Sequence, residues 1–472
     1  MSQATSRREF LTTSALGAAA LSAARTSVAA PSDPKDVAVW ITAGDQRLAA
    51  AAPIRWEAAG KTAAVVVDLD PTKKHQEVLG FGASFTDAAC FMLNELGDKE
   101  REALLHELFH PSEMGLSVCR TCIGSSDYAT HLYSYDDGVD PDVGLTRFSI
   151  AHDRKYILPM LRQARSMNPE LFLLASPWSP PGWMKSNNSM LGGNMQRRYM
   201  GSHAQYFVRF IQEYAKEGVP IKAVTVNNEV DTDQDGRMPA CLWPQEYEVD
   251  FVRNDLGPAF EKAGLSTQIW ILDHNYNLWG RALASLSEPN MLKYCQGIAW
   301  HGYVGDAARV TQVQEAFPDV GMYWTEGGPD VTNADYATDW VRWGKTFTSN
   351  LRNWCRAVTA WNYALDHEGN PNIGPFPCGG LVTVHGVTKE VSYSGQFWAM
   401  AQFSSFVKSG AKRIASEGDY SDLFHVAFRN PDGQCVLVIT NGSDKERSVA
   451  LHVSEQHAEV QLAPNSVTTL VW

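Results

Sequence analysis

The chain has 472 residues, 44% of them hydrophobic and 20% charged, which is the composition of a globular protein that buries a large core. This length exceeds that of one small domain, so we expect one large unit with an accessory module. The net charge of −13 leaves no basic excess to neutralise phosphates, which argues against a nucleic-acid partner.

The N-terminus has the pattern of an export signal. Ser6-Arg7-Arg8-Glu9-Phe10-Leu11 is a twin-arginine motif, and it is followed by an apolar run and by small residues at Ser27-Val28-Ala29. The run is too short to span a bilayer, and no later stretch is long and apolar enough. We predict a signal peptide over 1–29, export by the twin-arginine machinery to the periplasm or exterior, and no stable membrane insertion. An incidental arginine pair before a helix is the alternative.

Residues 36–70 indicate β-structure. They contain DVAVWITAG and AAVVVDLD, two short runs rich in β-branched residues. We expect these strands to belong to a β-sandwich rather than to the region that follows.

Residues 72–408 alternate between short apolar runs and segments of helical period. The predicted strands are VLGFGASF, LSVCRTCIG, LFLLASPW, AVTVNNEV, QIWILDHN, GIAWHGY, GMYWTEG and AVTAWNYAL. One predicted helix has an apolar stripe at Tyr206, Phe207, Phe210, Ile211 and Tyr214, with Gly218 as its stop. Eight alternations predict an α/β fold, a (β/α)8 TIM barrel. An open doubly wound sheet would also alternate, but GFGASF lacks the third glycine of a dinucleotide-binding loop.

Residues 412–472 indicate β-structure again. DLFHVAFRN, QCVLVITNGS, RSVALHV and VTTLVW are separated by turn sequences such as Asn441-Gly442. We predict that these strands and those of 36–70 form one accessory β-sandwich.

Two glutamates lie at predicted strand ends, where barrel enzymes carry their catalytic groups. The fourth strand ends Val226-Asn227-Asn228-Glu229, and the seventh ends Tyr323-Trp324-Thr325-Glu326. Two carboxylates across a barrel mouth suit double-displacement glycoside hydrolysis, in which one attacks the anomeric carbon and the other acts as acid and then base. We expect the charge of the nucleophile to raise the pKa of its partner. Two solvated or salt-bridged glutamates are the alternative.

No metal or cofactor is expected. Cys119 and Cys122 have the spacing of a metal or redox pair, but no second such pair completes a zinc site. The strand ends show no His-x-His motif or His/Asp cluster that would indicate a metal-dependent hydrolase.

From about residue 75 to the C-terminus the chain carries, in this order, the motifs LGFGASFTDAA, CRTCIGSSDY, LLASPWSPPGWMK, TVNNEV, YWTEGG and SGQFWAMAQFSSFVKSGAKRI. In these motifs it resembles glycoside hydrolase family 30, which includes the glucosylceramidases. The resemblance implies a retaining enzyme with Glu229 as acid/base and Glu326 as nucleophile.

The resemblance also implies a sugar site. Asn228 matches the residue that binds the 2-hydroxyl, Arg120 an arginine near the carboxylates, and Tyr303 a tyrosine near the nucleophile. The positions that bind or enclose the terminal sugar are matched by Asp127, Trp178 and Trp361. A turn role for Asn228 and a structural ion pair for Arg120 are the alternatives, and a packed structural role is expected for His301.

Two departures bear on the substrate. Val230 follows Glu229 where relatives carry Pro; both residues favour an extended backbone at Glu229. The segment NPNIGPFPCGG (370–380) does not match the sugar-binding Asn of human-type glucosylceramidases. We expect cleavage of β-glucosides as by a glucosylceramidase, with β-1,6-glucan, β-xylosides or β-fucosides as alternatives. A catalytically inactive carbohydrate-binding barrel is a further alternative, which the presence of both glutamates disfavours.

Overall fold

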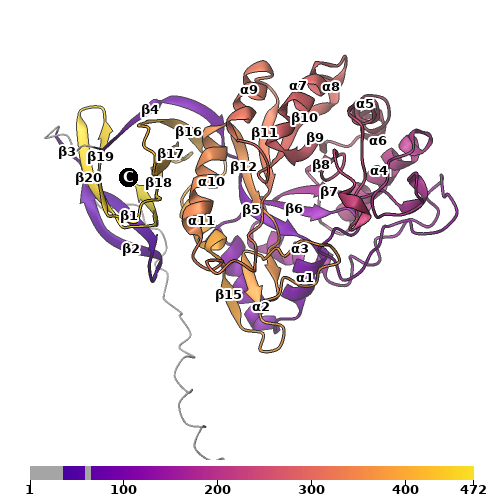
Figure 1. The fold of residues 1–472 in the computed structure, drawn as a ribbon, viewed down its shortest axis with the longest axis horizontal. Coiled ribbons are helices and arrows are strands. Elements are labelled where there is room, and N and C mark those ends of the chain that lie inside the picture. Colours follow the sequence, from indigo (N-terminus) through magenta and orange to yellow (C-terminus); the bar gives the residue numbers. More distant parts are fainter. Residues whose placement is uncertain (1–35, 59–64) are drawn as a thin grey trace, which may run out of the picture.

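The computed structural model describes residues 36–58 and 65–472, so the predicted signal peptide at 1–29 lies outside the described residues. A barrel surrounded by helices carries a β-sandwich on one side (Figure 1). In the described part of the chain, no helix is long and apolar enough to cross a membrane.

Eight parallel strands close a barrel in chain order, so the predicted TIM barrel is confirmed and the open-sheet alternative is wrong. Each predicted apolar run overlaps one of these strands. They are β5 (Gly80–Phe85), β6 (Val118–Cys122), β7 (Phe172–Ser176), β8 (Ala223–Thr225), β9 (Gln268–Asn275), β10 (Cys295–His301), β11 (Gly321–Glu326) and β12 (Cys355–Ala360).

Helices cover the outside of the barrel (Figure 1). The predicted stripe is buried on α4, and Gly218 follows the end of that helix with φ +77°, a conformation that glycine adopts without strain. The helices are α1 (Asp87–Asn94), α2 (Asp98–Phe109), α3 (Ile157–Met167), α4 (Met200–Lys216), α5 (Gln245–Asp250), α6 (Gly257–Ala263), α7 (Trp279–Ser287), α8 (Met291–Tyr294), α9 (Ala308–Ala316), α10 (Trp340–Arg352) and α11 (Gly395–Ser404). A small sheet of β13 (Ala364–Leu365), β14 (Val382–Val384) and β15 (Val391–Tyr393) follows β12.

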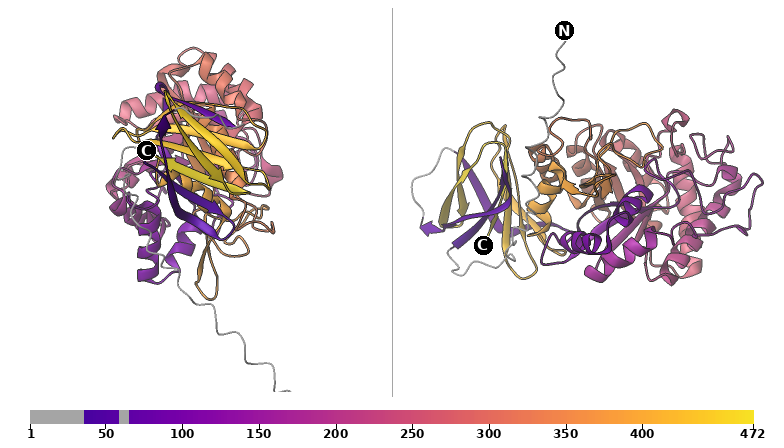
Figure 2. Two further views of the ribbon diagram at one scale, coloured as in Figure 1. Left: turned by 90° about the vertical axis from the view of Figure 1, so that its left-hand side faces the viewer. Right: turned by 90° about the horizontal axis from the view of Figure 1, so that it is seen from below.

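The sandwich joins strands from both ends of the chain, as predicted (Figure 2). The N-terminal strand β1 pairs with the last strand β21, and β4 pairs with β16 and β19. The strands are β1 (Asp36–Ala43), β2 (Gln46–Arg55), β3 (Glu57–Ala58), β4 (Val66–Glu77), β16 (Lys412–Glu417), β17 (Leu423–Arg429), β18 (Cys435–Asn441), β19 (Arg447–Val453), β20 (Gln456–Leu462) and β21 (Ser466–Val471). Alternating apolar residues of these strands form a separate core that includes Val37, Val67, Leu437 and Leu470.

Helices α10 and α11 hold the sandwich to the barrel. Trp340 on α10 donates from its indole nitrogen to the carbonyl of Asn465 over 2.8 Å. Gln402 on α11 donates to Thr42 Oγ1 over 2.9 Å, and Thr469 Oγ1 donates to Gln402. These contacts fix the sandwich against the barrel wall, while the carboxyl ends of the barrel strands form the site described below.

Candidate active site

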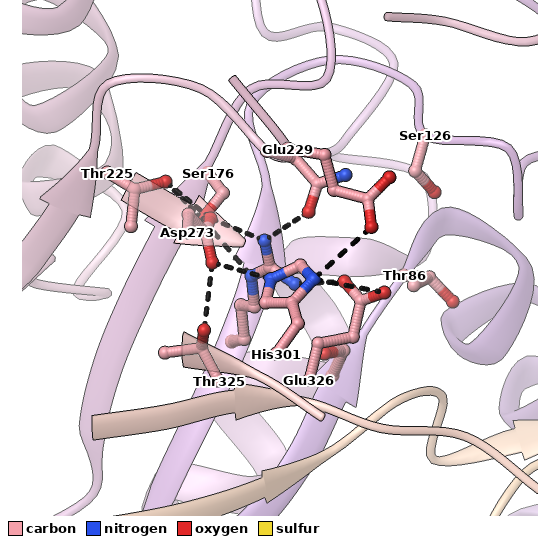
Figure 3. Close-up of polar contacts among 12 residues, drawn as sticks. Thr86, Ser126, Ser176, Thr225, Glu229, Asp273, His301, Thr325 and Glu326 are labelled. Carbon is pink, nitrogen blue, oxygen red and sulfur yellow. Dashed lines mark hydrogen bonds and ion pairs between the residues drawn. The ribbon is translucent and has the colours of Figure 1, made fainter. Parts of the chain in front are cut away.

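The carboxyl ends of the barrel strands bring a group of charged side chains together (Figure 3). Glu326 and His301 are the last residues of β11 and β10, and Asp273 lies near the end of β9. Glu229 follows the end of β8 by four residues. Because parallel strands end on the same side of a barrel, these residues from distant parts of the chain converge.

Arg120 lies at the centre of this group and is fully buried. Its guanidinium donates to Glu326 Oε2 over 2.5 Å, to Asp273 Oδ2 over 2.6 Å and to Asn228 Oδ1 over 2.8 Å. The indole ring of Trp178 lies against it, 4.6 Å from the guanidinium carbon. The planar fork of arginine suits this arrangement, because one charge holds two carboxylates and an amide at fixed angles.

Asp273 is buried and accepts hydrogen bonds from several strands. The donors are Arg120 Nη2, Ser176 Oγ, Thr225 Oγ1, Thr325 Oγ1 and His301 Nε2, at 2.6 to 2.9 Å. An ionised carboxylate only accepts, so His301 carries a proton on Nε2. In the neutral imidazole, the lone pair of Nδ1 then faces the two glutamates.

Glu229 is held from two sides. Gln234 donates to its Oε2 over 2.6 Å, while its Oε1 lies 3.4 Å from His301 Nδ1 and 3.6 Å from His274 Nδ1. The expected extended backbone is wrong, since Glu229 has φ +52°. Its amide donates to the carbonyl of Asp273 over 2.9 Å, and this anchoring offsets a left-handed conformation that costs about 1–3 kcal/mol for a non-glycine residue.

His301 also limits the separation of the two glutamates. Its Nδ1 lies 3.4 Å from Glu229 Oε1 and 3.8 Å from Glu326 Oε1, so those two oxygens are at most about 7 Å apart. Retaining glycosidases place their carboxyl groups about 5–5.5 Å apart. The geometry therefore accommodates a retaining pair.

Burial and neighbouring charges shift the pKa values of the site residues in opposite directions. Burial opposes ionisation of Asp273, yet Arg120 and His301 hold its pKa well below the usual range. Burial raises the pKa of Glu326, whereas at Glu229 the effect of burial is outweighed by His301 and His274, and the pKa is lowered. Burial is outweighed at His301 as well, where Glu326 and Asp273 raise the pKa to about 9. The pKa of Glu229 is therefore lowered in this structure and not raised as expected, because His301 and His274 favour its ionised form.

The structure places the remaining predicted residues around the same group. Asn228 is buried beside Arg120, and Tyr303 donates from its hydroxyl to Glu326 Oε1 over 3.1 Å. Trp178 and Trp361 stack with ring centres 5.0 Å apart. Asp127 is buried, and its Oδ1 has no hydrogen-bond partner among the described residues. An acceptor left free in this way fits the predicted contact with a substrate hydroxyl.

The segment 370–380 packs directly on Asp127. The amide of Ile373 donates to the Asp127 carbonyl over 2.7 Å, and a Cβ at Gly374 would lie 2.6 Å from Asp127 Cβ. Tyr128 holds the other end of the segment, because its hydroxyl donates to the carbonyl of Phe376 and accepts from the amide of Cys378. The segment that departs from the glucosylceramidases therefore forms a wall of the site.

Sequence reasoning missed several members of the group. Asp273 and His274 lie at the end of the fifth barrel strand, within QIWILDHN. The prediction that the strand ends carry no His/Asp cluster was therefore wrong. One ligand atom each from Glu229, His274 and His301 lies within 4.8 Å of the others. Gln234, on the loop after β8, had no recognisable signal.

A barrel that places one glutamate just after its fourth strand and another at the end of its seventh, with His301 beside both, is the arrangement expected of a glycoside hydrolase. The chain matches the model of the glycosyl hydrolase family 30 TIM-barrel domain over residues 78–407. It matches that of the family's beta sandwich domain over residues 410–470. The chain belongs to glycosyl hydrolase family 30, whose members are retaining enzymes.

Characterised relatives differ in substrate. The chain is 34% identical to the endo-1,6-beta-D-glucanase of Neurospora crassa, over 86% of this chain and 88% of the relative. It is 29% identical to the lysosomal acid glucosylceramidase of Mus musculus, over 86% and 83%. A solved endo-beta1,6-glucanase superposes with a TM-score of 0.84 and 28% identity, over 93% of this chain and 99% of the other.

Proposed function

We propose that this protein is a retaining β-glycosidase that hydrolyses β-1,6-linked glucan. The arrangement of His301 between Glu229 and Glu326 is the observation that carries the chemistry. The choice of glucan is supported by the named glucanase relatives and by the segment 370–380, which departs from the glucosylceramidases at the wall of the site.

In this proposal the two glutamates have distinct roles. Glu326 attacks the anomeric carbon as the nucleophile, because Arg120 and Tyr303 bind its two oxygens and the charge of Arg120 partly offsets the burial that raises its pKa. Glu229 protonates the leaving oxygen as it departs and then takes a proton from the water that hydrolyses the glycosyl–enzyme ester. His301 stands next to Glu229 with a proton that it can share as the charge of Glu326 is consumed.

The sugar ring fits among the predicted binding residues. The aromatic faces of Trp178 and Trp361 enclose one side of the site, and the free oxygen of Asp127 accepts from a sugar hydroxyl. Asn228 is oriented by Arg120, so that its amide nitrogen is available to the 2-hydroxyl. A hydrogen bond at that hydroxyl strengthens as the transition state develops.

Glucosylceramide is the second candidate substrate, supported by the mouse relative. A panel of β-1,6-glucan, gentio-oligosaccharides, aryl β-glucoside, β-xyloside, β-fucoside and glucosylceramide separates the two. The proposal expects the highest kcat/KM on β-1,6-linked oligosaccharides. A higher kcat/KM on glucosylceramide would contradict the choice of glucan but not the retaining chemistry.

We also propose that the protein is exported by the twin-arginine route to the periplasm or exterior. The support is the Arg7-Arg8 motif and the apolar run that follows it. Replacing both arginines with lysine in the producing cell should leave the protein in the cytoplasm. Unchanged export would contradict the proposal.

A further inference from the structure

The proposed acid/base and two neighbouring histidines together have the composition of a metal site, which the hydrolytic reaction does not require. Glu229, His274 and His301 come from three successive strand ends, and one ligand atom of each lies within 4.8 Å of the other two. Two imidazoles and one carboxylate are a frequent ligand set for zinc, with a fourth position left to water. We propose that these residues form an inhibitory zinc site, which removes the acid/base from catalysis when it is filled.

The two distances from Glu229 to the histidine nitrogens suit zinc. Glu229 Oε1 lies 3.4 Å from His301 Nδ1 and 3.6 Å from His274 Nδ1. Ligand atoms about 2.0–2.2 Å from a tetrahedral ion are separated by roughly 3.3–3.6 Å. The other oxygen, Oε2, is already bonded to Gln234, which leaves Oε1 for the ion.

Zinc must displace the proton that a pKa of about 9 leaves on His301 at neutral pH, after which the nitrogen atoms of both histidines can face the ion. His301 Nδ1 is buried and has no hydrogen-bond partner among the described residues. Asp273 accepts from the opposite nitrogen of that ring, which is the carboxylate–histidine contact that orients many zinc ligands. His274 Nδ1 has one long contact, 3.3 Å from Asn275 Nδ2, which a metal–nitrogen bond would replace.

Charge and access also favour a divalent cation. Glu229, Glu326 and Asp273 supply three carboxylates against the one guanidinium of Arg120, so the group has two excess negative charges when its histidines are neutral. Glu229 and His274 keep 13% and 11% of their side-chain surfaces exposed, which leaves an approach from the mouth of the barrel. Nitrogen-rich ligands of this kind select zinc over magnesium or calcium.

Inhibition follows from the position of the ion and rests on the proposed role of Glu229. A zinc ion on Oε1 prevents that carboxyl from donating a proton to the leaving group. Full activity is therefore expected in the presence of a chelator, whereas a zinc-dependent hydrolase would lose activity there.

The test measures zinc binding and activity separately on the purified mature protein after chelation and dialysis. Zinc binding is followed by calorimetry, and initial rates are measured on an aryl β-glucoside over the same zinc range. His274→Asn and His274→Gln each remove one ligand, and circular dichroism confirms that at least one variant is folded. His106→Asn is the matched control, because His106 stacks on His110 at the surface of α2 and that pair could bind zinc independently.

The proposal expects one strong zinc equivalent in the wild type and in His106→Asn, with inhibition that follows its saturation and is reversed by chelator. In the folded His274 variant the Kd for zinc should rise at least 10-fold, and the inhibitory concentration should rise with it. An unchanged Kd, or full activity at saturating zinc, would overturn the proposal. If zinc binds as expected but no β-1,6-glucan is cleaved, the metal site stands and the proposed substrate fails.

Discussion

Nη1 of Arg120 lies 2.5 Å from Oε2 of Glu326, and neither side chain of this pair is substantially exposed. The two residues are 206 positions apart, and the same guanidinium also binds Asp273 and Asn228. Arg120 therefore holds Glu326, the proposed nucleophile, together with Asp273 and Asn228 through a single charged group.

Replacing Arg120 with lysine should reduce kcat/KM on an aryl β-glucoside by on the order of 100-fold or more. An ammonium keeps the charge but cannot reproduce the planar fork that bonds Glu326 and Asp273 together. Steady-state kinetics measure the effect. Arg309→Lys, on the exposed side of α9, is the control and should retain full activity; an equally active Arg120→Lys would contradict the role of the fork.

Asp273→Asn keeps the shape of the side chain but removes its charge. Arg120 and the proton on His301 Nε2 then lose their anionic partner, so we expect a lower apparent Tm and a fall in kcat/KM of about 10- to 100-fold. Thermal unfolding and kinetics check the two effects. A variant as stable and active as the wild type would show that the buried charge is dispensable.

Gln234→Ala removes the hydrogen bond to Glu229 Oε2. Because this contact orients Glu229, the proposed acid/base, we expect about a 10-fold lower kcat on gentio-oligosaccharides and a smaller loss on aryl glycosides with good leaving groups, which need little protonation. Gln312→Ala on the surface of α9 is the control. Equal losses on both substrates would mean that Gln234 does not act through Glu229.

Stability should depend on pH through Asp153, which lies outside the active site. Burial raises its pKa to about 6, although Tyr135 and Tyr214 donate to it. A raised carboxyl pKa means that the folded state holds a proton that the unfolded state has lost. The free energy of unfolding is therefore highest below about pH 4. It falls by about 3 kcal/mol as the pH rises through 6, where Asp153 in the folded protein loses its proton.

Asp153→Asn removes this dependence, because the amide stays neutral. The apparent Tm of the variant minus that of the wild type should rise between pH 4 and pH 7. Asp140→Asn, an exposed site, is the control. If the Tm difference between Asp153→Asn and the wild type does not change with pH, burial does not destabilise the ionised carboxylate of Asp153.

The barrel could be predicted because each of its strands is a short buried run ending in polar residues. The sandwich strands β2, β3, β16 and β20 were missed. β2 has the sequence QRLAAAAPIR, which is largely exposed and has few β-branched residues, and β20 has charged and polar residues at alternate positions. Pairing with neighbouring strands, which the local sequence does not encode, makes them strands.

The two glutamates were found because strand order alone places them across the barrel mouth. The contacts that shift the pKa values of the two glutamates could not be predicted. Asp273 and His274 make these contacts with Arg120, His301 and Glu229, which lie on or after other strands. The backbone of Glu229 was mispredicted for the same reason. Its left-handed conformation is stabilised by a hydrogen bond to the carbonyl of Asp273 rather than by the residue that follows it.

The roles of the two glutamates can be separated by substitution. Glu229→Gln should lose far more activity on poor leaving groups than on activated aryl glycosides, because only the former need protonation. Glu326→Gln should lose turnover on both. Equal losses at Glu229 on both kinds of substrate would count against its assignment as acid/base.

The most direct test of the central claim is trapping of the glycosyl–enzyme with an activated 2-deoxy-2-fluoro-β-glucoside, followed by mass spectrometry of the intact protein and its peptides. The account predicts one fluoro-sugar per chain, attached to the peptide that contains Glu326, and no label in Glu326→Gln. A label on the Glu229 peptide, or turnover of an aryl β-glucoside by Glu326→Gln at the wild-type rate, would contradict it.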